Sequence, residues 1–446
     1  MQPEHRAQPG SQPGGWGSGQ QYGQSSGQPA GQPAARAAGQ PAGSSAGQGT
    51  AASAQQPPSV PPQIDPQTAG AGSAPTVSSR MTVPGYPSGP AAPAEEKVDT
   101  GPLPSRETLR REARAASSRR GAGDADVERA GELLKSVANI FSQRVVGQEQ
   151  LRRALVTALM SSGHILLESV PGLAKTTAAQ TLASAVSGSF RRIQCTPDLM
   201  PNDIVGTQIL NSSTGEMTTQ LGPVHANIVL LDEINRSSAK TQSAMLEAMQ
   251  ERQTSIGGVV YPLPHPFMVL ATQNPIEEEG TYVLPEAQMD RFLMKEVLTY
   301  PRPSEEADVL DRISNGTFDQ PVTGRPISTD DVEWLQRAAE RVYVDPVIKQ
   351  YIVALINTSR GGGPRPVPGL DRQVRVGASP RGGIALMKVA QAVALQEGRT
   401  YVIPDDVRLL RHGVLRHRLV LTYDALADGV APEAIIDAIF AAVPTP

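Results

Sequence analysis

The sequence predicts an α/β domain with a mostly parallel five-stranded sheet, followed by a helical domain and preceded by a long disordered tail. Three observations lead to this prediction. Between about residues 126 and 302, five short apolar runs of strand length alternate with segments of helical periodicity. Beyond residue 303 the segments are helical and no strand is evident. Residues 1–125 are rich in Gly, Gln, Pro, Ser and Ala, and such chains bury too little apolar surface to offset the entropy of folding.

The tail is expected to act as a flexible tether or interaction arm. The tripeptide GQP recurs at Gly27, Gly31 and Gly39, as in low-complexity linkers. The charged stretch Arg106–Arg120 is interpreted as a solvated linker, with a transient helix or contact with an acidic surface as the alternative. The folded part is therefore expected to begin near residue 126.

Composition excludes several classes of protein. At 446 residues the chain is long enough for two or three domains, and its formal net charge of −4 does not suit a protein that mainly coats nucleic acid. The single cysteine, Cys195, excludes an internal disulfide framework and suits a reducing compartment. The first residues lack a basic region followed by an apolar run, and no stretch approaches the roughly 18 apolar residues of a membrane span. A cytoplasmic protein without an integral membrane segment is expected.

Each expected element rests on its hydrophobic period. Two helices, Val127–Phe141 and Gln148–Met160, precede the first strand, and a third covers residues 177–185. The five expected strands are His164–Glu168, Phe190–Gln194, Ile228–Asp232, Met268–Gln273 and Leu293–Leu298. The helical domain, residues 303–446, has helical segments at 304–314, 329–342, 346–358, 380–396 and 404–416, several of which begin at Ser, Asp or Pro.

A phosphate-binding loop with unusual glycine positions follows the first strand. In residues 164–177, HILLESVPGLAKTT, Lys175 and Thr176 match the end of the pattern G-x-x-x-x-G-K-[ST]. Ser169 and Ala174 replace the two framing glycines, and Gly172 alone remains within the loop. The order strand, loop, helix suits an anion held at a helix N-terminus. Taken alone, the stretch leaves open a working variant, a degenerate site or a coincidence.

Two carboxylates end the third expected strand. Residues 228–236, IVLLDEINR, place Asp232 and Glu233 directly after four apolar residues. In open parallel sheets, ligands bind at the carboxyl ends of the strands. Asp232 would hold Mg²⁺ and Glu233 would orient or deprotonate the attacking water. A strand that merely ends in an acidic turn explains this motif alone, but poorly explains both motifs in this order.

From about residue 127 to 440 the sequence resembles an AAA+ ATPase, specifically one of the MoxR family, which belongs to the helix-2-insert branch. The motifs that carry the resemblance are Val145–Gln148 (VVGQ), Val170–Thr176 (VPGLAKT), Leu231–Arg236 (LDEINR), Ala271–Pro275 (ATQNP), Leu284–Phe292 (LPEAQMDRF) and Gly377–Arg381 (GASPR). The resemblance implies a P-loop NTPase core over residues 126–302 and an all-α lid over residues 303–446. It also favours a working variant of the loop.

The resemblance implies a role for each matching residue. Glu233 would activate water, Asn274 would be the sensor 1 group and Arg291 an arginine finger acting on a neighbouring subunit. Arg381, at the start of a lid helix, would be sensor 2 and reach the γ-phosphate. Mg²⁺ would be held by Thr176 and Asp232, and ATP would be bound by Val145 and Val146 at the adenine and by Pro171, Gly172, Leu173, Ala174, Lys175, Thr176 and Thr177 at the phosphates.

Two further segments predict β-hairpins. One pairs the strands around residues 206–210 and 216–220, and the other covers residues 253–263 and turns at Gly257 and Gly258. They match the helix-2 insert and the hairpin before sensor 1 of the resembled branch, where such loops usually face the pore or a partner.

The function expected from the resemblance is that of an ATP-hydrolysing ring, with a hexamer as the expected form, that remodels or activates protein clients with a von Willebrand factor A domain partner. One alternative is a motor of the same branch that acts on DNA or in metal chelation. Another is a nucleotide-binding scaffold that does not hydrolyse ATP.

Overall fold

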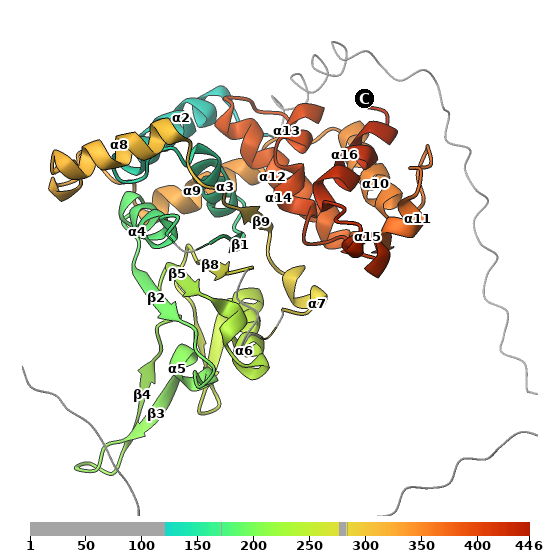
Figure 1. Ribbon diagram of the computed structural model, residues 1–446. Helices are drawn as coiled ribbons and strands as arrows, with labels where there is room; N and C mark the ends of the chain where they lie inside the picture. Colours follow the sequence, from blue (N-terminus) through green and yellow to red (C-terminus); the bar gives the residue numbers. More distant parts are fainter. Residues whose placement is uncertain (1–120, 171, 276–281, 283) are drawn as a thin grey trace, which may run out of the picture. The chain divides into compact units, whose positions relative to one another are not determined.

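The structure is a computed structural model that describes residues 121–170, 172–275, 282 and 284–446 (Figure 1). All of these residues belong to one compact unit, Ala94–Pro446. The expected disordered tail falls outside the described residues, apart from its last five positions. The first described helix, α2, covers Asp124–Arg144 and is followed by α3, Glu149–Met160.

The core of this unit is a five-stranded parallel sheet. Its strands are β1 (Ile165–Glu168), β2 (Phe190–Gln194), β5 (Ile228–Asp232), β8 (Met268–Gln273) and β9 (Met294–Val297). They are arranged in the order β2-β5-β8-β1-β9, and every neighbouring pair is parallel. The prediction of a five-stranded parallel sheet is confirmed, and the bounds of its strands differ from the expected ones by one residue at most.

Helices cover both faces of the sheet, which explains why its inner strands are continuously apolar. Successive side chains of a strand point to opposite faces. On β5, Ile228 and Leu230 therefore join one apolar cluster, with α4 (Lys175–Ala185), whereas Val229 and Leu231 join another, with α6 (Ala239–Glu251).

Two antiparallel hairpins extend from this core, as expected. One consists of β3 (Gly206–Leu210) and β4 (Met217–Leu221), which follow the short helix α5 (Pro201–Val205), and the other of β6 (Gln253–Ile256) and β7 (Val259–Pro262). The Tyr261 hydroxyl donates a hydrogen bond to Thr219 Oγ1 at 3.0 Å. The β3–β4 hairpin projects away from the sheet (Figure 1).

The C-terminal part is mainly helical. Its longer helices are α8 (Pro303–Ser314), α9 (Thr329–Glu340), α10 (Pro346–Ser359), α12 (Pro380–Gln396) and α16 (Pro432–Ala442). The short helices are α7 (Glu286–Met289), at the end of the core, α11 (Leu370–Gln373), α13 (Pro404–Leu409), α14 (Arg411–Leu415), α15 (Tyr423–Ala427) and the 3₁₀ turn η2 (Thr317–Asp319). Residues of the C-terminal helices α9 and α12 share one apolar cluster with residues of α3. These two C-terminal helices therefore pack directly on the core.

Two details differ from the sequence analysis. The segment 404–416 is two helices, because Leu410 leaves the helical region with φ −113° and ψ 23°. A short antiparallel pair, β10 (Val374–Val376) with β11 (Val420–Leu421), also lies in the lid, where no strand was evident from the sequence. Runs of two and three residues are too short to show a period of two.

Candidate functional site

The phosphate-type loop joins β1 to α4 and has two left-handed residues. Gly172 has φ +87°, and Ala174, directly before Lys175, has φ +54°. Ala174 thus adopts the conformation that glycine takes more readily, at a cost of roughly 1–2 kcal/mol. Ser169 is not among the described residues with positive φ, so the first framing position does not require a glycine here. Pro171 lies outside the described residues.

Lys175 begins α4 and points back over the loop. Its Nζ donates a hydrogen bond to the carbonyl oxygen of Ser169 at 3.4 Å. Thr176 and Thr177 follow in the first turn of the helix, whose N-terminus has no side-chain cap. The ammonium and the uncapped N–H groups therefore converge on the loop, which is the arrangement that binds phosphates.

An apolar cavity of about 760 Å³ opens beside the loop. Both residues expected at an adenine, Val145 and Val146, line it together with Gly172, Leu173, Ala174 and Thr177 of the loop. Its other wall comes from the start of the helical part, with Tyr300, Val309, Leu310 and Phe318. This wall was missed by the sequence analysis. The volume and the apolar lining suit a nucleotide base.

Asp232 ends β5 as a buried carboxylate with strong partners. Its Oδ1 accepts a hydrogen bond from the Thr272 hydroxyl at 2.8 Å, and the same hydroxyl accepts one from the Glu233 N–H at 2.8 Å. Its Oδ2 accepts from Arg192, at 2.5 Å from Nη2 and 3.1 Å from Nε. The guanidinium of Arg192 therefore balances a charge that would otherwise be buried alone.

Glu233 lies beside Asp232 in the left-handed conformation, with φ +57°. Its Oε2 accepts a hydrogen bond from Gln194 Nε2 at 3.2 Å and forms an ion pair with Arg236 Nε at 2.9 Å. Sequence analysis missed the roles of Arg192 and Gln194. The register of β2 against β5, which places Gln194 opposite Asp232, is the signal that identifies them.

The residues at this sheet edge suit a metal ion. The carboxylate of Asp232 and the hydroxyl of Thr176 are hard oxygen donors, which Mg²⁺ prefers. Asn274, which is buried, directly follows β8. Because β8 lies between β5 and β1, Asn274 stands between the carboxylates and the loop along the same edge.

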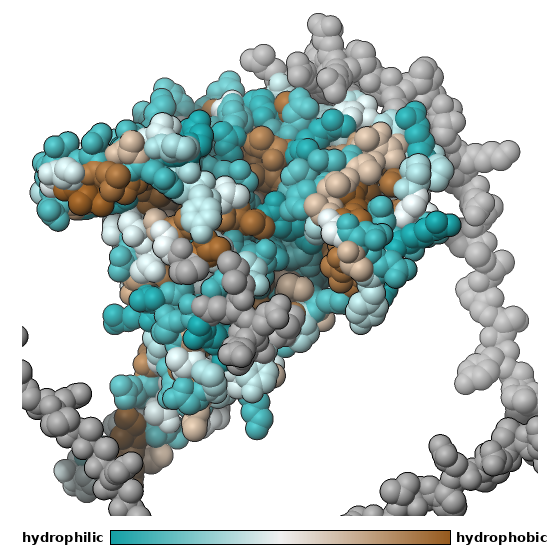
Figure 2. Space-filling model, in the orientation of Figure 1, coloured by the Kyte–Doolittle hydropathy of each residue, from teal (hydrophilic) through white to brown (hydrophobic). Residues whose placement is uncertain are grey.

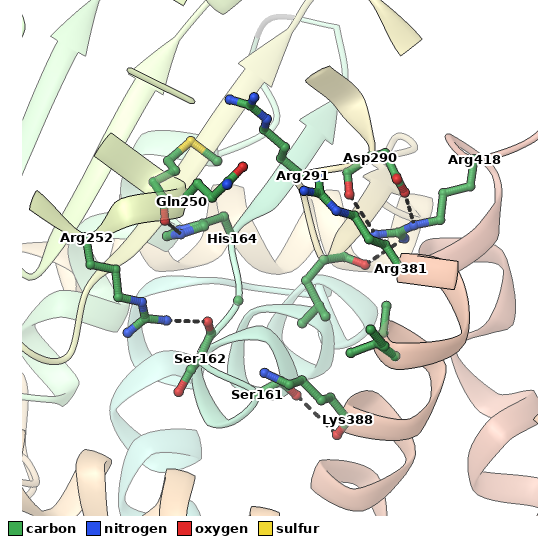
Figure 3. A pocket seen from close by; sticks show the side chains of 15 residues that line it. Ser161, Ser162, His164, Gln250, Arg252, Asp290, Arg291, Arg381, Lys388 and Arg418 are labelled. Atoms are coloured by element: carbon green, nitrogen blue, oxygen red, sulfur yellow. Dashed lines mark hydrogen bonds and ion pairs between the residues drawn. The ribbon is translucent and has the colours of Figure 1, made fainter. Parts of the chain in front are cut away.

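Arg291 and Arg381 lie elsewhere, in a second cavity of about 320 Å³ (Figure 3). Gly163 and His164, which precede β1, and Leu293, which precedes β9, also line this cavity. It therefore lies at the amino ends of these strands, whereas the loop lies at the carboxyl end of β1. A four-residue strand separates the two edges by roughly 13 Å.

The second cavity is strongly cationic. Arg252, Lys388 and Arg418 line it in addition to Arg291 and Arg381, and the acidic residue among its lining is Asp290. The pKa of Arg418 is lowered to about 10, mainly by burial. The negative charge and the hydrogen bond of Asp290 partly counteract this shift. Burial also lowers the pKa of His164 to about 4, so this imidazole is neutral at pH 7 and adds no charge.

The loop after β1, the carboxylates after β5 and the base-sized cavity define a nucleotide-binding protein of the P-loop class. The family model of the ATPase family associated with various cellular activities (AAA) matches residues 164–294, and that of the AAA lid domain matches residues 370–439. The chain is 48% identical to Chaperone MoxR1 of Mycobacterium tuberculosis over 302 residues, which cover 68% of this chain and 79% of the relative.

Two further relatives are similar over most of their length. YeaC of Bacillus subtilis is 45% identical over 316 residues, 70% of this chain and 95% of the relative. A solved structure assigned as an ATPase, from Cytophaga hutchinsonii, is 40% identical with a TM-score of 0.67, and the match covers 75% of this chain and 99% of that one. The chain belongs to the MoxR family of AAA+ ATPases. None of the helices in the described part of the chain combines the length and the apolar composition of a membrane span.

The left-handed backbone of Ala174 gives a testable prediction. Ala174→Gly should keep nucleotide affinity and change the free energy of unfolding by no more than about 1 kcal/mol, because relief of strain offsets the greater entropy of the unfolded chain. Ala174→Val should lose about 1–2 kcal/mol and bind nucleotide more weakly, since a β-branched residue resists this conformation. Urea unfolding and nucleotide titration measure both. Equal behaviour of the two variants would contradict this account of the loop.

The hydroxyl of Thr272 joins Asp232 to the backbone of Glu233. Thr272→Val should lower the free energy of unfolding by about 1–3 kcal/mol, because it leaves the buried N–H of Glu233 without an acceptor. Thr272→Ser retains the hydroxyl and should lose about 1 kcal/mol or less, for the missing methyl group. If the serine variant is as unstable as the valine variant in urea unfolding, the hydroxyl does not make the expected contribution.

Proposed function

We propose that this protein hydrolyses ATP with Mg²⁺ and works as a homo-oligomeric ring, with a hexamer as the expected form, that remodels or activates protein clients. The observation that supports this proposal most strongly is that the phosphate loop lies far from Arg291 and Arg381, which line the second cavity. A subunit holds the phosphate loop at one sheet edge and Arg291 with Arg381 at the other. A second subunit is then needed to complete each site.

In this proposal the residues at the carboxyl edge bind ATP and prepare the water. The N–H groups of the loop and Lys175 hold the phosphates, and Thr176 and Asp232 hold Mg²⁺, which neutralises phosphate charge when bound. Asn274 and Glu233 orient the attacking water. Since Arg192 and Arg236 engage the two carboxylates in the described structure, these ion pairs must loosen when the site is filled.

Arg291 and Arg381 would act on the nucleotide of the neighbouring subunit. Their guanidinium groups would stabilise the negative charge that develops on the transferred phosphoryl group. The expected sensor 2 role of Arg381 is retained, but its position beside Arg291 favours the neighbour's γ-phosphate over that of its own subunit.

The surface of the two hairpins supports the proposal that the clients are proteins. Exposed apolar side chains gather on them, namely Ile209, Leu210, Met217, Leu221, Val259 and Val260. Figure 2 shows apolar surface along the β3–β4 hairpin and along α8. Residues 206–221 and 253–262 contain no Lys or Arg, so they offer no cations to a nucleic-acid backbone. A protein client also agrees with the name of the relative Chaperone MoxR1. The proposal includes a partner with a von Willebrand factor A domain.

The catalytic roles predict two separable defects. Glu233→Gln should bind ATP normally and lose turnover by about 10²–10⁴-fold, because it can no longer activate water. Lys175→Ala should lose ATP binding, because it removes the cation that contacts the phosphates. Nucleotide titration and a phosphate-release assay, with and without single-stranded DNA, measure both defects. Normal turnover by Glu233→Gln would refute its role, and strong stimulation by DNA would favour the DNA motor.

The trans arrangement predicts complementation between defective subunits. Arg291→Ala should bind ATP and lose turnover by about 10³–10⁵-fold, as expected for an arginine finger. Mixed with Glu233→Gln, it should regain activity, because some interfaces then combine an intact Glu233 with an intact Arg291. The control is the same mixture under conditions that prevent subunit exchange. If exchanging subunits gain no activity, Arg291 does not act in trans.

A further inference from the structure

A partly buried polar network links the segments that carry Arg291 and Arg381, and its centre is Asp290. This residue follows α7 and directly precedes Arg291. Its Oδ1 accepts a hydrogen bond from Arg418 Nε at 2.8 Å, and its Oδ2 accepts one from the Ser379 hydroxyl at 2.7 Å. One carboxylate therefore ties the segment that carries Arg291 to two separate parts of the lid.

Ser379 extends this network to the other arginine. It is the N-cap of α12, and its Oγ accepts a hydrogen bond from the backbone N–H of Arg381 at 3.1 Å. The same oxygen donates its proton to Asp290. Two hydrogen bonds in series thus join the backbone of Arg381 to the carboxylate beside Arg291.

Arg418 fixes the other side of the network. Its side chain is 2% exposed, and all five of its N–H groups have acceptors. Besides the carboxylate, it donates to the carbonyl oxygens of Asp290, Phe292, Leu293 and Val414. A planar guanidinium with five partners holds a rigid geometry. The segment from Asp290 to Leu293 is therefore fastened to the lid by one side chain.

We propose that Asp290 is a positioning residue for ATP hydrolysis, which holds Arg291 and Arg381 at a fixed separation so that they meet the neighbouring subunit's γ-phosphate as one unit. The proposal rests on the trans role of both arginines given above. Its physical basis is charge: Arg291, Arg381 and Arg418 repel one another, and Asp290 is the acidic group among the residues that line their cavity. A movement of the lid would then carry the arginine finger with it.

Two variants test the positioning role. Asp290→Asn keeps the shape and removes the charge, and Ser379→Gly cuts the link to α12 while glycine still serves as an N-cap. Each should lower kcat by roughly 10²-fold, as small misplacements of catalytic groups do. The dissociation constant of ATP should stay unchanged, because the loop lies at the opposite sheet edge.

Asp406→Asn is the matched control. It disrupts the Arg399–Asp406 pair, another buried ion pair of the lid, with 2.7 Å between Arg399 Nη1 and Asp406 Oδ2. Neither Arg399 nor Asp406 lines the second cavity. This variant should lower the melting temperature and leave kcat at the wild-type value. A general loss of stability is thereby distinguished from loss of positioning.

A combined variant gives the sharpest readout. In a background that carries both Arg291→Ala and Arg381→Ala, Asp290→Asn should lower kcat by less than about threefold, because both groups that it positions are already gone. An undiminished 10²-fold loss in that background would overturn the positioning role. So would wild-type kcat in both Asp290→Asn and Ser379→Gly, and the serine variant decides if the aspartate variant does not fold. Normal turnover by Arg291→Ala alone would instead refute the proposed trans function itself.

Discussion

The parallel direction of the five strands is the constraint on which the rest of the structure depends. Because all strands run the same way, their carboxyl ends meet at one edge of the sheet and their amino ends at the other. The loop after β1, the carboxylates after β5 and Asn274 after β8 therefore share the first edge. Arg291, which precedes β9, lies at the second. Residues at opposite edges of the same sheet do not meet within one subunit, and in the proposed mechanism Arg291 therefore acts on the ATP site of another subunit.

The loop shows that glycine is favoured where the backbone is left-handed, and not simply where the usual motif has a glycine. Gly172 and Ala174 are left-handed, whereas Ser169 takes its place without positive φ. The first substitution in the usual pattern therefore costs nothing in backbone strain, and the second has a modest cost. Around the carboxylates, Arg192 and Arg236 neutralise Asp232 and Glu233 in the described structure. The same residues that would hold metal and water are stabilised by ion pairs that ligand binding has to replace.

Local patterns predicted the parts of this molecule that depend on neighbours in sequence. The five strands and both hairpins follow from hydrophobic period and turn residues. Contacts between distant segments could not be predicted in this way. Arg192 and Gln194 need the register of β2 against β5, and the wall formed by Leu310 and Phe318 needs the packing of the lid. In the sequence, Arg418 is one more basic residue in a helical region. In the structure, four of its five hydrogen bonds go to Asp290, Phe292 and Leu293, which flank Arg291.

The central claim is that the arginines at the amino edge of one subunit complete the ATP site at the carboxyl edge of the next. A structure of the assembled Glu233→Gln protein with ATP and Mg²⁺ tests it most directly. The account predicts the guanidinium groups of Arg291 and Arg381 within about 3 Å of the γ-phosphate oxygens bound to the neighbouring subunit. Arginines that contact the γ-phosphate of their own subunit, or an ATP site completed without either of them, would contradict it.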